Sequence, residues 1–411
     1  MEPRIGYLTP EFPGQTHAFI WRERQFLREV GIQTDIVSTR RPPKGIMSQS
    51  WAQEAEATTA YLTPFGIADG VAGIVELLRA GPVAWSRCLA EIFKAEGLSA
   101  QQRLKMLAIA FIATKLVRLS RTQGWSHIHV HSCAEAAHLA LFASKLSRLT
   151  YSLAFLGPVL EIYGPNQANK WKNSQFAVVM SNLMLADVQH KIGTALPAQV
   201  EIASMGVDTD VFRRATPYEP WQPDRPCRIY SCGRLNPVKG HKYLIAAIAK
   251  LRQQGLDIQL QIAGEDEQGG TGYRKEIEQC IRDHQLSDYV ELLGAVSEEQ
   301  NRHYIEQADL FVLASLNEGI SVAVMQAMAM EIPVICTRVG GMHELIDSGV
   351  DGILVQPEQT QELVEAIANV LRNPDLASQL SQQARQKVMA KFDHRVGAKV
   401  LVQCLKSAQL V

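Results

Sequence analysis

Basic side chains stand at one predicted strand end, in a loop bounded by glycine and proline. The segment GRLNPVKGH, Gly233–His241, follows the buried run IYSC and leads into a helix. Arg234 and Lys239 lie five positions apart in it, so the loop could direct both cations at one diphosphate. A solvated basic loop is the alternative interpretation. Strand ends face ligands in open α/β sheets, and this favours an anion site.

An acid and a helix start follow a second predicted strand, Leu310–Leu313. The next stretch, ASLNEGISVAVMQAMAMEIPVI, places Glu318 and Gly319 in a short loop before a helix whose predicted N-cap is Ser321. Free N–H groups at a helix start suit a phosphate, and Glu318 could bond ligand hydroxyls. Gln326, eight residues after Glu318, could hold another part of the same ligand. The same pattern also occurs in doubly wound domains that have no specific site.

A histidine ends a third predicted strand, Ile128–Val130. His131 therefore occupies another strand end of the kind that faces ligands. The alternative is a structural histidine, because His129 lies two residues earlier and points to the same face of the strand. The pattern leaves both interpretations open.

Other nucleotide and metal motifs are missing from the sequence. No GxGxxG follows the first predicted strand and no GxxxxGK[ST] occurs, which argues against dinucleotide oxidoreductases and P-loop enzymes. Asp208, Thr209 and Asp210 form a DxD, but their surroundings, MGVDTDVF, are typical of a turn. The seven cysteines form no CxxC pair and the histidines show no zinc spacing. We predict no metal site and a reduced, cytosolic protein.

The composition is that of a globular protein with two or three domains. The 411 residues are 46% hydrophobic and 20% charged. A net charge of -1 gives no general attraction to nucleic acid, so no nucleic-acid partner is predicted. The first residues, MEPRIGYLTPEF, lack a secretory leader pattern, and no window holds eighteen uninterrupted apolar residues. We expect neither secretion by that route nor a membrane span.

Strands and helices alternate in two successive blocks, which predicts an α/β protein with two doubly wound domains facing across a cleft. We predict an N-terminal domain over residues 1–207, a proline-containing linker over 208–225 and a C-terminal domain over 226–390. Residues 391–411 are predicted to form a final helix that packs back on the N-terminal domain.

One predicted helix carries an uneven charge pattern. Residues 101–123 contain basic but no acidic side chains among many apolar ones. The basic residues are Arg103, Lys105, Lys115, Arg118 and Arg121. Such a helix can lie on an anionic membrane surface, or it can pack on its own domain. Peripheral contact with the inner face of the membrane is one expectation for this segment.

Several motifs, taken in order, resemble one family. GRLNPVKG, NEGISVAVMQAMAMEIPVI and VGGMHELIDSG resemble the retaining glycosyltransferases of family 4, which have the two-domain GT-B fold. MGVDTDVF is similar to their interdomain stretch, and YLTPEFPGQTHAFIWRE to their N-terminal loop. The resemblance covers nearly the whole chain and is most specific over Gly233–Gly352. It implies a GT-B fold whose C-terminal domain binds most of the sugar donor.

The resemblance also implies roles for individual residues. Arg234 and Lys239 would bind the donor diphosphate, Glu318 would meet sugar hydroxyls, and His131 would lie near the reacting sugar. These four are the expected catalytic residues. The expected donor-binding positions are Gly14, Gly233, Gly319, Ile320, Ser321, Val322, Gln326, Gly340 and Gly341. No cofactor or metal is expected beyond the nucleotide-sugar donor, which is a substrate.

Two positions depart from the family pattern. Gln326 stands where the family has a glutamate that binds the nucleotide ribose, and an amide keeps an acceptor and donors but loses the charge. Ala154 and Leu156, in SLAFLGP, stand where threonine and histidine are frequent. We therefore expect weaker ribose binding and either altered activity or altered substrate choice.

The predicted activity is the transfer of a hexosyl group from a nucleotide-diphosphate sugar to a saccharide or lipid-linked acceptor, with retention of configuration. Exopolysaccharide, lipopolysaccharide or glycolipid synthesis would use such a reaction. Preorganised cations would stabilise the departing diphosphate. Two alternatives stay open: a UDP-sugar epimerase of GT-B fold, and a non-catalytic subunit that binds a sugar nucleotide.

Overall fold

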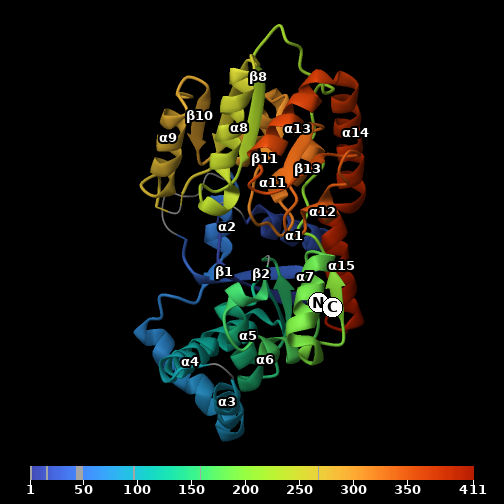
Figure 1. Cartoon of the computed structure of the whole chain (residues 1–411). Helices are drawn as coiled ribbons and strands as arrows, with labels where there is room; N and C mark the ends of the chain where they lie inside the picture. Colours follow the sequence, from blue (N-terminus) through green and yellow to red (C-terminus); the bar gives the residue numbers. More distant parts are fainter. Residues whose placement is uncertain (1, 15–16, 43–49, 96–97, 158, 267) are drawn as a thin grey trace. The chain divides into compact units, whose positions relative to one another are not determined.

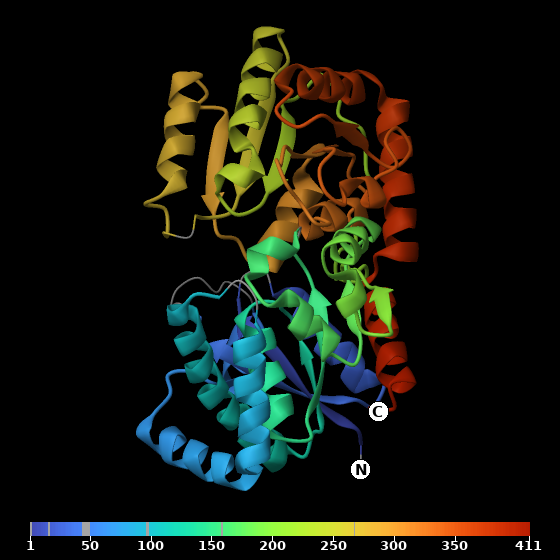
Figure 2. The ribbon, with the colours of Figure 1, turned by 60° about the horizontal axis from the view of Figure 1, so that its bottom comes forward.

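The computed structural model describes the chain except residues 1, 15–16, 43–49, 96–97, 158 and 267. It contains two compact units, each built on one parallel β-sheet with helices packed against it (Figures 1 and 2). Trp51–Ser204 and Gly397–Val411, with the first two strands, form the N-terminal unit. Met205–Val396 forms the C-terminal unit. The prediction of an α/β protein with two doubly wound domains is confirmed.

The N-terminal sheet has seven parallel strands in the order β3-β2-β1-β4-β5-β6-β7. The strands are β1 (Arg4–Glu11), β2 (Gln33–Arg40), β3 (Ala60–Tyr61), β4 (His127–Val130), β5 (Thr150–Phe155), β6 (Ala177–Val179) and β7 (Val200–Ile202). The helices are α1 (Ala18–Glu29), α2 (Ala52–Thr58), α3 (Ile67–Lys94), α4 (Ala100–Gln123), α5 (Glu135–Leu146), α6 (Gln167–Lys172), α7 (Asn182–Ile192) and α15 (His394–Ser407), with short 3-10 turns at Leu160–Tyr163 and Gly193–Ala195.

The final helix completes the core of the N-terminal unit. Leu401 and Leu405 of α15 are fully buried in one cluster with Ile5 of β1 and Ile36 of β2. Elsewhere α5 packs on the sheet, α4 packs on α5, and α3 packs on α4. The N-terminal unit therefore contains both the first strand of the sequence and its last helix.

The C-terminal sheet has six parallel strands in the order β10-β9-β8-β11-β12-β13. The strands are β8 (Cys227–Cys232), β9 (Ile258–Ala263), β10 (Val290–Gly294), β11 (Leu310–Leu313), β12 (Val334–Thr337) and β13 (Ile353–Val355). The helices are α8 (His241–Gln253), α9 (Tyr273–Asp283), α10 (Glu298–Gln307), α11 (Val322–Ala329), α12 (Met342–Leu345), α13 (Thr360–Arg372) and α14 (Pro374–Lys391), with a 3-10 turn at Pro237–Lys239.

Burial explains why these strands could be predicted. All four residues of β11 are buried, because helices cover both faces of a parallel sheet and its strands become continuous apolar runs. The predicted bounds of β11 are confirmed. A capping box between Ser297 and Gln300, a pattern readable in the sequence, opens α10. The short elements α2 and β3 were not predicted from the sequence.

Two segments at which the chain changes units, near Gly206 and near His394, run alongside each other. Backbone N–H groups link them: Val207 donates to Phe392 at 2.9 Å, and His394 donates to Val207 at 2.9 Å. Glycine permits this approach, since a Cβ on Gly206, where φ is +67°, would lie 2.6 Å from the Cα of His394. A Cβ on Gly397 would lie 2.1 Å from the carbonyl oxygen of Ser204.

The DxD segment lies beside these two segments and its side chains make local contacts. The Asp208 carboxylate accepts a bond from the backbone N–H of Asp210 at 3.1 Å, which is an Asx-type turn. Thr209 donates to Asp393 at 2.6 Å, and Asp210 pairs with Arg395 at 2.9 Å. These contacts support the interpretation of the segment as a turn.

The structure also bears on membrane spans and on disulfide bonds. Within the described part of the chain, no helix is both long and apolar enough to cross a bilayer. All seven cysteines are free thiols.

Candidate active site

Two predicted ligand-binding loops lie together because their strands are neighbours. Strands β8 and β11 pair in parallel, with Ile229 opposite Leu310, so both chains leave the same edge of the sheet. The Leu316 N–H donates to the Val238 carbonyl at 2.7 Å. A Cβ on Gly240, where φ is +62°, would lie 1.9 Å from the Ala314 carbonyl oxygen. The loop after β8 is thus held against the loop after β11 by direct backbone contact.

An ion pair joins these two loops. The Lys239 ammonium lies 2.5 Å from the Glu318 carboxylate, and the side chains are only 18% and 11% exposed. The Ser315 hydroxyl donates to the same carboxylate oxygen at 2.7 Å. Thr337, on neighbouring strand β12, donates its hydroxyl to the Ser315 carbonyl. The cation and the acid that the sequence predicted to hold different parts of a ligand therefore contact each other.

Two glycines bring a third loop against the same acid. Gly340 follows β12 with φ of +50°, and a Cβ there would lie 1.6 Å from the Glu318 carbonyl oxygen. The Gly341 N–H donates to the Gly319 carbonyl at 2.8 Å. A Cβ on Gly341 would lie 2.5 Å from that same oxygen. The structure thus gathers the ends of three adjacent strands, β8, β11 and β12, around Glu318 and Gly319.

Helix α11 begins at this meeting point. Ser321 is the N-cap residue, as predicted, but its side chain accepts no capping hydrogen bond. Ile320 and Ser321 are buried and Val322 is half-buried. The first amides of a helix have no partner within the helix. An uncapped start gives them capacity to bind an anion, and the helix dipole would favour its charge.

Arg234 and Gly233 occupy the loop after β8. Gly233 donates its N–H to the Ala263 carbonyl at 2.9 Å, which ties the loop to the end of β9. A Cβ on neighbouring Gly264 would lie 1.9 Å from the Gly233 carbonyl oxygen. The Arg234 side chain is exposed on the same loop as Lys239. The loop therefore presents one solvent-facing cation and one half-buried cation.

Gln326 takes part in a buried hydrogen-bond chain that the sequence did not reveal. Its side-chain oxygen accepts a bond from the Asn301 amide at 2.9 Å, and the Tyr230 hydroxyl donates to the Asn301 oxygen at 2.7 Å. Asn301 is buried on α10, 25 residues from Gln326 in the chain. Nothing local marks Asn301 as a partner, because its neighbours on α10 are polar and exposed.

Two further buried groups near Lys239 escaped the sequence reasoning. His241 opens α8 with both ring nitrogens buried and unpaired. Burial, followed by the charge of Lys239, lowers its pKa to about 4. Burial raises the pKa of the Cys232 thiol to about 11. Both side chains are therefore uncharged at neutral pH, so Lys239 has one nearby counter-charge, Glu318, among the contacts described.

The N-terminal unit has its own polar cluster, at the end of β4. His131 Nε2 lies 3.3 Å from Glu23 Oε1, and the Tyr7 hydroxyl donates to that same oxygen at 2.6 Å. The Tyr7 and His131 rings lie 4.8 Å apart. Burial, then the charge of Glu23, raises the pKa of Tyr7 well above its usual value. Tyr7 is therefore a proton donor that fixes the carboxylate facing His131.

Three side chains of this cluster are close enough together to hold a metal ion, although the sequence shows no zinc spacing. Ligand atoms of Glu23, His129 and His131 lie within 4.8 Å of one another, the one such group in the described part of the chain. The His129 Nδ1 atom is engaged with the Ser152 hydroxyl at 2.8 Å. Burial, then the neighbouring histidines, lowers the pKa of His129 well below its usual value. Neutral imidazole and carboxylate are suitable ligands for zinc and similar ions.

The remaining predicted positions in the N-terminal unit have local roles. Gly14 lies in the loop after β1, where its carbonyl accepts the N–H of His17 at 3.0 Å. Leu156 packs against the hydrophobic cluster that includes Ile5 and the buried Ala154. The position for which the resemblance implied a polar residue is therefore apolar and packs against the core. His131 and Gly14 belong to a different unit from Lys239 and Glu318.

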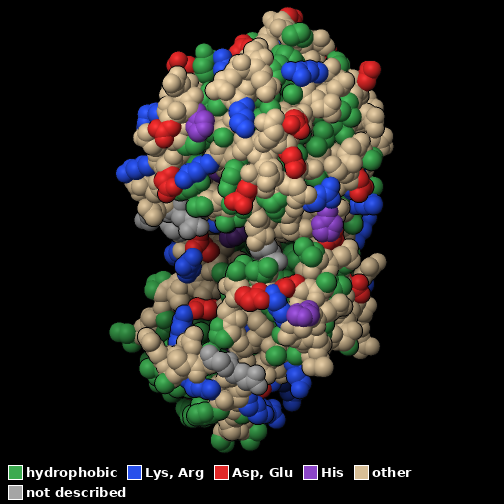
Figure 3. Space-filling view, viewed as in Figure 1, with side chains coloured by type: hydrophobic (Ala, Val, Ile, Leu, Met, Phe, Trp, Pro, Cys, Tyr) green, Lys and Arg blue, Asp and Glu red, His purple; other side chains and the backbone are tan. Residues whose placement is uncertain are grey.

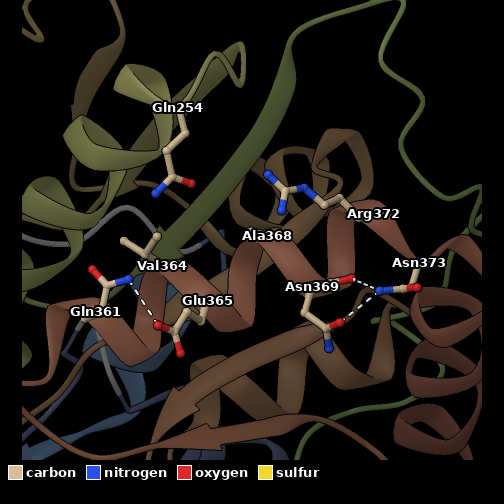
Figure 4. Close-up of a pocket in the computed structure, with 8 residues that line it drawn as sticks. All are labelled: Gln254, Gln361, Val364, Glu365, Ala368, Asn369, Arg372 and Asn373. Atoms are coloured by element: carbon tan, nitrogen blue, oxygen red, sulfur yellow. Dashed lines mark hydrogen bonds between the residues drawn. The ribbon is translucent and has the colours of Figure 1, made fainter.

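Surface grooves do not locate the site. One groove of about 260 Å³ lies over α13 and the end of α8 (Figure 4). It is lined by Gln254, Gln361, Val364, Glu365, Ala368, Asn369, Arg372 and Asn373. Its polar side chains bond along their own helix, as Gln361 does with Glu365 at 3.1 Å. Convergent polar groups at the strand ends are therefore the better marker of a site.

Comparison with known proteins identifies the family of the C-terminal unit. Residues 219–387 match the family model described as Glycosyl transferases group 1. The C-terminal unit carries a group 1 glycosyltransferase domain. Strands β8, β11 and β12 and the loops around Lys239 and Glu318 all lie within the matched residues.

Similar proteins agree with this group 1 assignment. The alpha-D-kanosaminyltransferase of Streptomyces kanamyceticus is 33% identical over 169 residues, 41% of this chain and 42% of that protein. The putative colanic acid biosynthesis glycosyltransferase WcaL of Escherichia coli K12 is 26% identical over 284 residues, 67% of this chain and 68% of that protein. The match to the first relative thus covers less than half of its length.

A solved structure supports the fold. HepE of Anabaena, in complex with UDP and glucose, superposes with a TM-score of 0.72 over 98% of this chain and 100% of that chain. At 17% identity the likeness shows the fold alone, which is GT-B. The prediction of a GT-B fold is confirmed, and the match over residues 219–387 supports the prediction of a glycosyltransferase. The narrower assignment to family 4 stays a prediction.

Replacing Gly340 by alanine should destabilise the C-terminal unit, because the new Cβ would overlap the Glu318 carbonyl in a left-handed backbone. Gly349→Ala is the matched control: its φ is +86°, but nothing lies within 4 Å of an added Cβ. We expect the control to lose about 1–2 kcal/mol from the backbone penalty alone. Gly340→Ala should lose more than about 3 kcal/mol. Equal thermal midpoints for the two variants would contradict the proposed contact between the loops.

Proposed function

We propose that this protein is a retaining glycosyltransferase that moves a hexosyl group from a nucleotide-diphosphate sugar to a saccharide or lipid-linked acceptor. The observation that carries the proposal is the half-buried pair of Lys239 and Glu318 beside the uncapped start of α11. An anion at that point would meet a cation and free backbone amides. A sugar next to the anion would meet a carboxylate.

In this proposal the cations and backbone amides bind the diphosphate, and Glu318 orients the sugar. Lys239 has three donor protons, so it can keep its bond to Glu318 while it donates to a phosphate oxygen. Arg234 adds a second cation from the same loop, and the amides of Gly319–Val322 surround the phosphate. The leaving diphosphate gains charge as the glycosidic bond breaks, and these fixed groups stabilise that charge without reorganising. Glu318 accepts hydrogen bonds from sugar hydroxyls.

Retention in this proposal comes from attack on the face that the diphosphate leaves. The departing phosphate oxygen accepts the proton of the acceptor hydroxyl, so no carboxylate nucleophile is needed. This part rests on the resemblance to family 4, as does the placement of His131 near the reacting sugar. The contact between His131 and Glu23 supports a polar role for this histidine. The hydrogen bond from Tyr7 keeps the carboxylate in place.

Relatives suggest which ligands to test first. HepE was solved with UDP and glucose, which makes UDP-sugars the first donors to screen. WcaL is named for colanic acid and AmsK of Erwinia amylovora for amylovoran, so a growing polysaccharide or its lipid-linked precursor is the proposed acceptor class. A thermal-shift screen of nucleotide sugars would identify the donor, because a ligand of the native state raises the unfolding midpoint.

Two rival functions have direct tests. A UDP-sugar epimerase would convert its donor to an epimerised sugar with no acceptor present, and chromatography of the donor after incubation alone would reveal it. A non-catalytic subunit would bind the donor in calorimetry yet show no turnover across an acceptor panel. The substitution at Gln326 and the apolar Leu156 motivate the second rival.

Transfer should continue in the presence of EDTA, because Lys239, Arg234 and the helix start can replace a metal at the diphosphate. A metal requirement is a concrete alternative, because Glu23, His129 and His131 could bind an ion. Turnover should be measured before and after EDTA, and again after Zn²⁺ or Mn²⁺ is restored. Loss with EDTA and recovery with metal would overturn the metal-free mechanism.

Removing either cation should abolish measurable transfer and weaken donor binding. Arg234→Ala and Lys239→Met each delete a charge-assisted contact worth roughly 1.5–3 kcal/mol, or about tenfold to a hundredfold in affinity. Lys242→Met is the matched control, because Lys242 is an exposed cation on the adjacent helix and pairs with Glu276 at 2.9 Å. Calorimetry with the donor and a turnover assay measure both effects. Normal turnover in either site variant would remove that residue from the diphosphate site.

A carboxylate at position 326 should tighten donor binding. Gln326→Glu keeps an oxygen that can accept from Asn301, so the fold should be preserved, while the added charge favours ribose hydroxyls by about 1 kcal/mol. Gln326→Leu would instead leave the buried Asn301 amide without this acceptor and cost about 1–3 kcal/mol of stability. Unchanged donor affinity in Gln326→Glu would show that the side chain does not reach the donor.

A further inference from the structure

Helix α3 exposes an unusually apolar surface. Its large apolar side chains include Ile67, Leu78 and Phe93, which are 91%, 69% and 73% exposed. Figure 3 shows apolar side chains gathered where Figure 1 places α3 and α4. The outer face of α3 is formed by Ile67, Val71, Ile74, Val75, Leu78, Val83, Trp85, Leu89 and Phe93, with Leu104 and Leu107 of α4 also exposed.

The spacing of these residues defines one continuous face on each half of the helix. Positions 67, 71, 74, 75 and 78 follow a helical repeat of three and four residues. The helix breaks at Gly81, where φ is 80°, and Pro82 starts the second half. Positions 85, 89 and 93 then repeat at intervals of four.

The first half of α3 turns charged side chains toward the protein, whereas the second half buries Ala84, Cys88 and Ile92. Asp69 binds Lys115 at 2.8 Å and Arg118 at 2.9 Å, both on α4. The Glu76 side chain is buried and pairs with Arg79 and with Arg121 of α4. The acids of the first half are therefore paired on the inner side, while both halves leave large apolar side chains exposed.

This arrangement changes how the basic helix α4 should be understood. Three of its cations, Lys115, Arg118 and Arg121, hold the acids of α3. Arg103 donates to the carbonyls that end α3, including Ala95 at 3.1 Å. The charges of α4 thus fix α3 in place, and α3 provides the outward apolar surface.

The exposed charges on α3 have one sign. Arg79, Arg87 and Lys94 are exposed, whereas the acids of α3 are paired. The third acid, Glu91, lies 3.2 Å from Lys145 of α5. An apolar stripe edged only by cations is complementary to an anionic surface with an apolar layer beneath it.

We propose that the outer face of α3 docks this protein on an anionic lipid bilayer. The apolar side chains enter the boundary between headgroups and acyl chains, and Arg79, Arg87 and Lys94 meet lipid phosphates. The helix lies on the membrane and does not cross it, in agreement with the lack of a spanning helix among the described residues. A second copy of the chain fits this face less well, because two such faces would bring like charges together.

This inference is independent of the proposed transfer reaction. Contiguous exposed apolar patches on soluble proteins usually mark an interaction surface. A lipid surface would also be the place to meet a lipid-linked acceptor, but the docking requires neither a donor nor turnover. Its test can therefore fail or succeed separately from the test of the active site.

Vesicle flotation of the full chain tests the proposal. We expect it to float with vesicles of phosphatidylcholine mixed with phosphatidylglycerol, much less with phosphatidylcholine alone, and less at high salt. Leu78→Ser with Phe93→Ser should lower the affinity by at least about tenfold. Val350→Ser with Met389→Ser is the matched control, since these exposed apolar residues lie in the C-terminal unit and should leave flotation unchanged.

A second variant separates charge from apolar contact. Arg87→Gln with Lys94→Gln should weaken binding to the mixed vesicles by roughly an order of magnitude and reduce its salt dependence. Thermal midpoints equal to the wild type confirm that each variant is folded. Absence of wild-type flotation, or equal flotation of the Leu78 and Phe93 double variant, would overturn the proposal. A dimer in light scattering that this double variant dissolves would assign the face to a second copy instead.

Discussion

The candidate site depends on backbone contact between loops that leave neighbouring parallel strands. Ala314 and Glu318 each present a carbonyl oxygen where a glycine of another loop must pass, at Gly240 and Gly340. A side chain at either glycine would push the loops apart. Because the two loops are in contact, the ammonium of Lys239 lies beside the carboxylate of Glu318. Strand order thus creates the polar centre, and the side chains then define its chemistry.

Local patterns predicted the framework of the C-terminal unit well. Strand β11 is a continuous apolar run and Ser297 with Gln300 is a local capping signal, so both follow from adjacent residues. The ion pair and the bond between Gln326 and Asn301 did not follow, because each joins elements whose distance is set by packing. The sequence indicated which groups matter at the site, while tertiary structure decided which of them share a partner.

In the N-terminal unit, too, local sequence indicated single residues, whereas packing determined their partners. His131 was recognisable as a strand-end histidine, but Glu23 approaches it from α1, far away in the chain, and Tyr7 from β1. The run of cations on α4 was visible in the sequence. That these cations face α3 follows only from their ion pairs with Asp69 and Glu76. Helical periodicity shows which side chains share a face but not whether that face is covered. Whether an apolar helix face is exposed is therefore a property that only packing can reveal.

The position of α15 has a consequence for how the protein is made. Leu401 and Leu405 fill the same cluster as Ile5, so the first domain to leave the ribosome lacks part of its core until residues 397–411 have also emerged. Domains generally fold in the order of synthesis. The N-terminal unit cannot complete its core in that order, and a chain cut before α15 would leave an apolar face of its sheet uncovered.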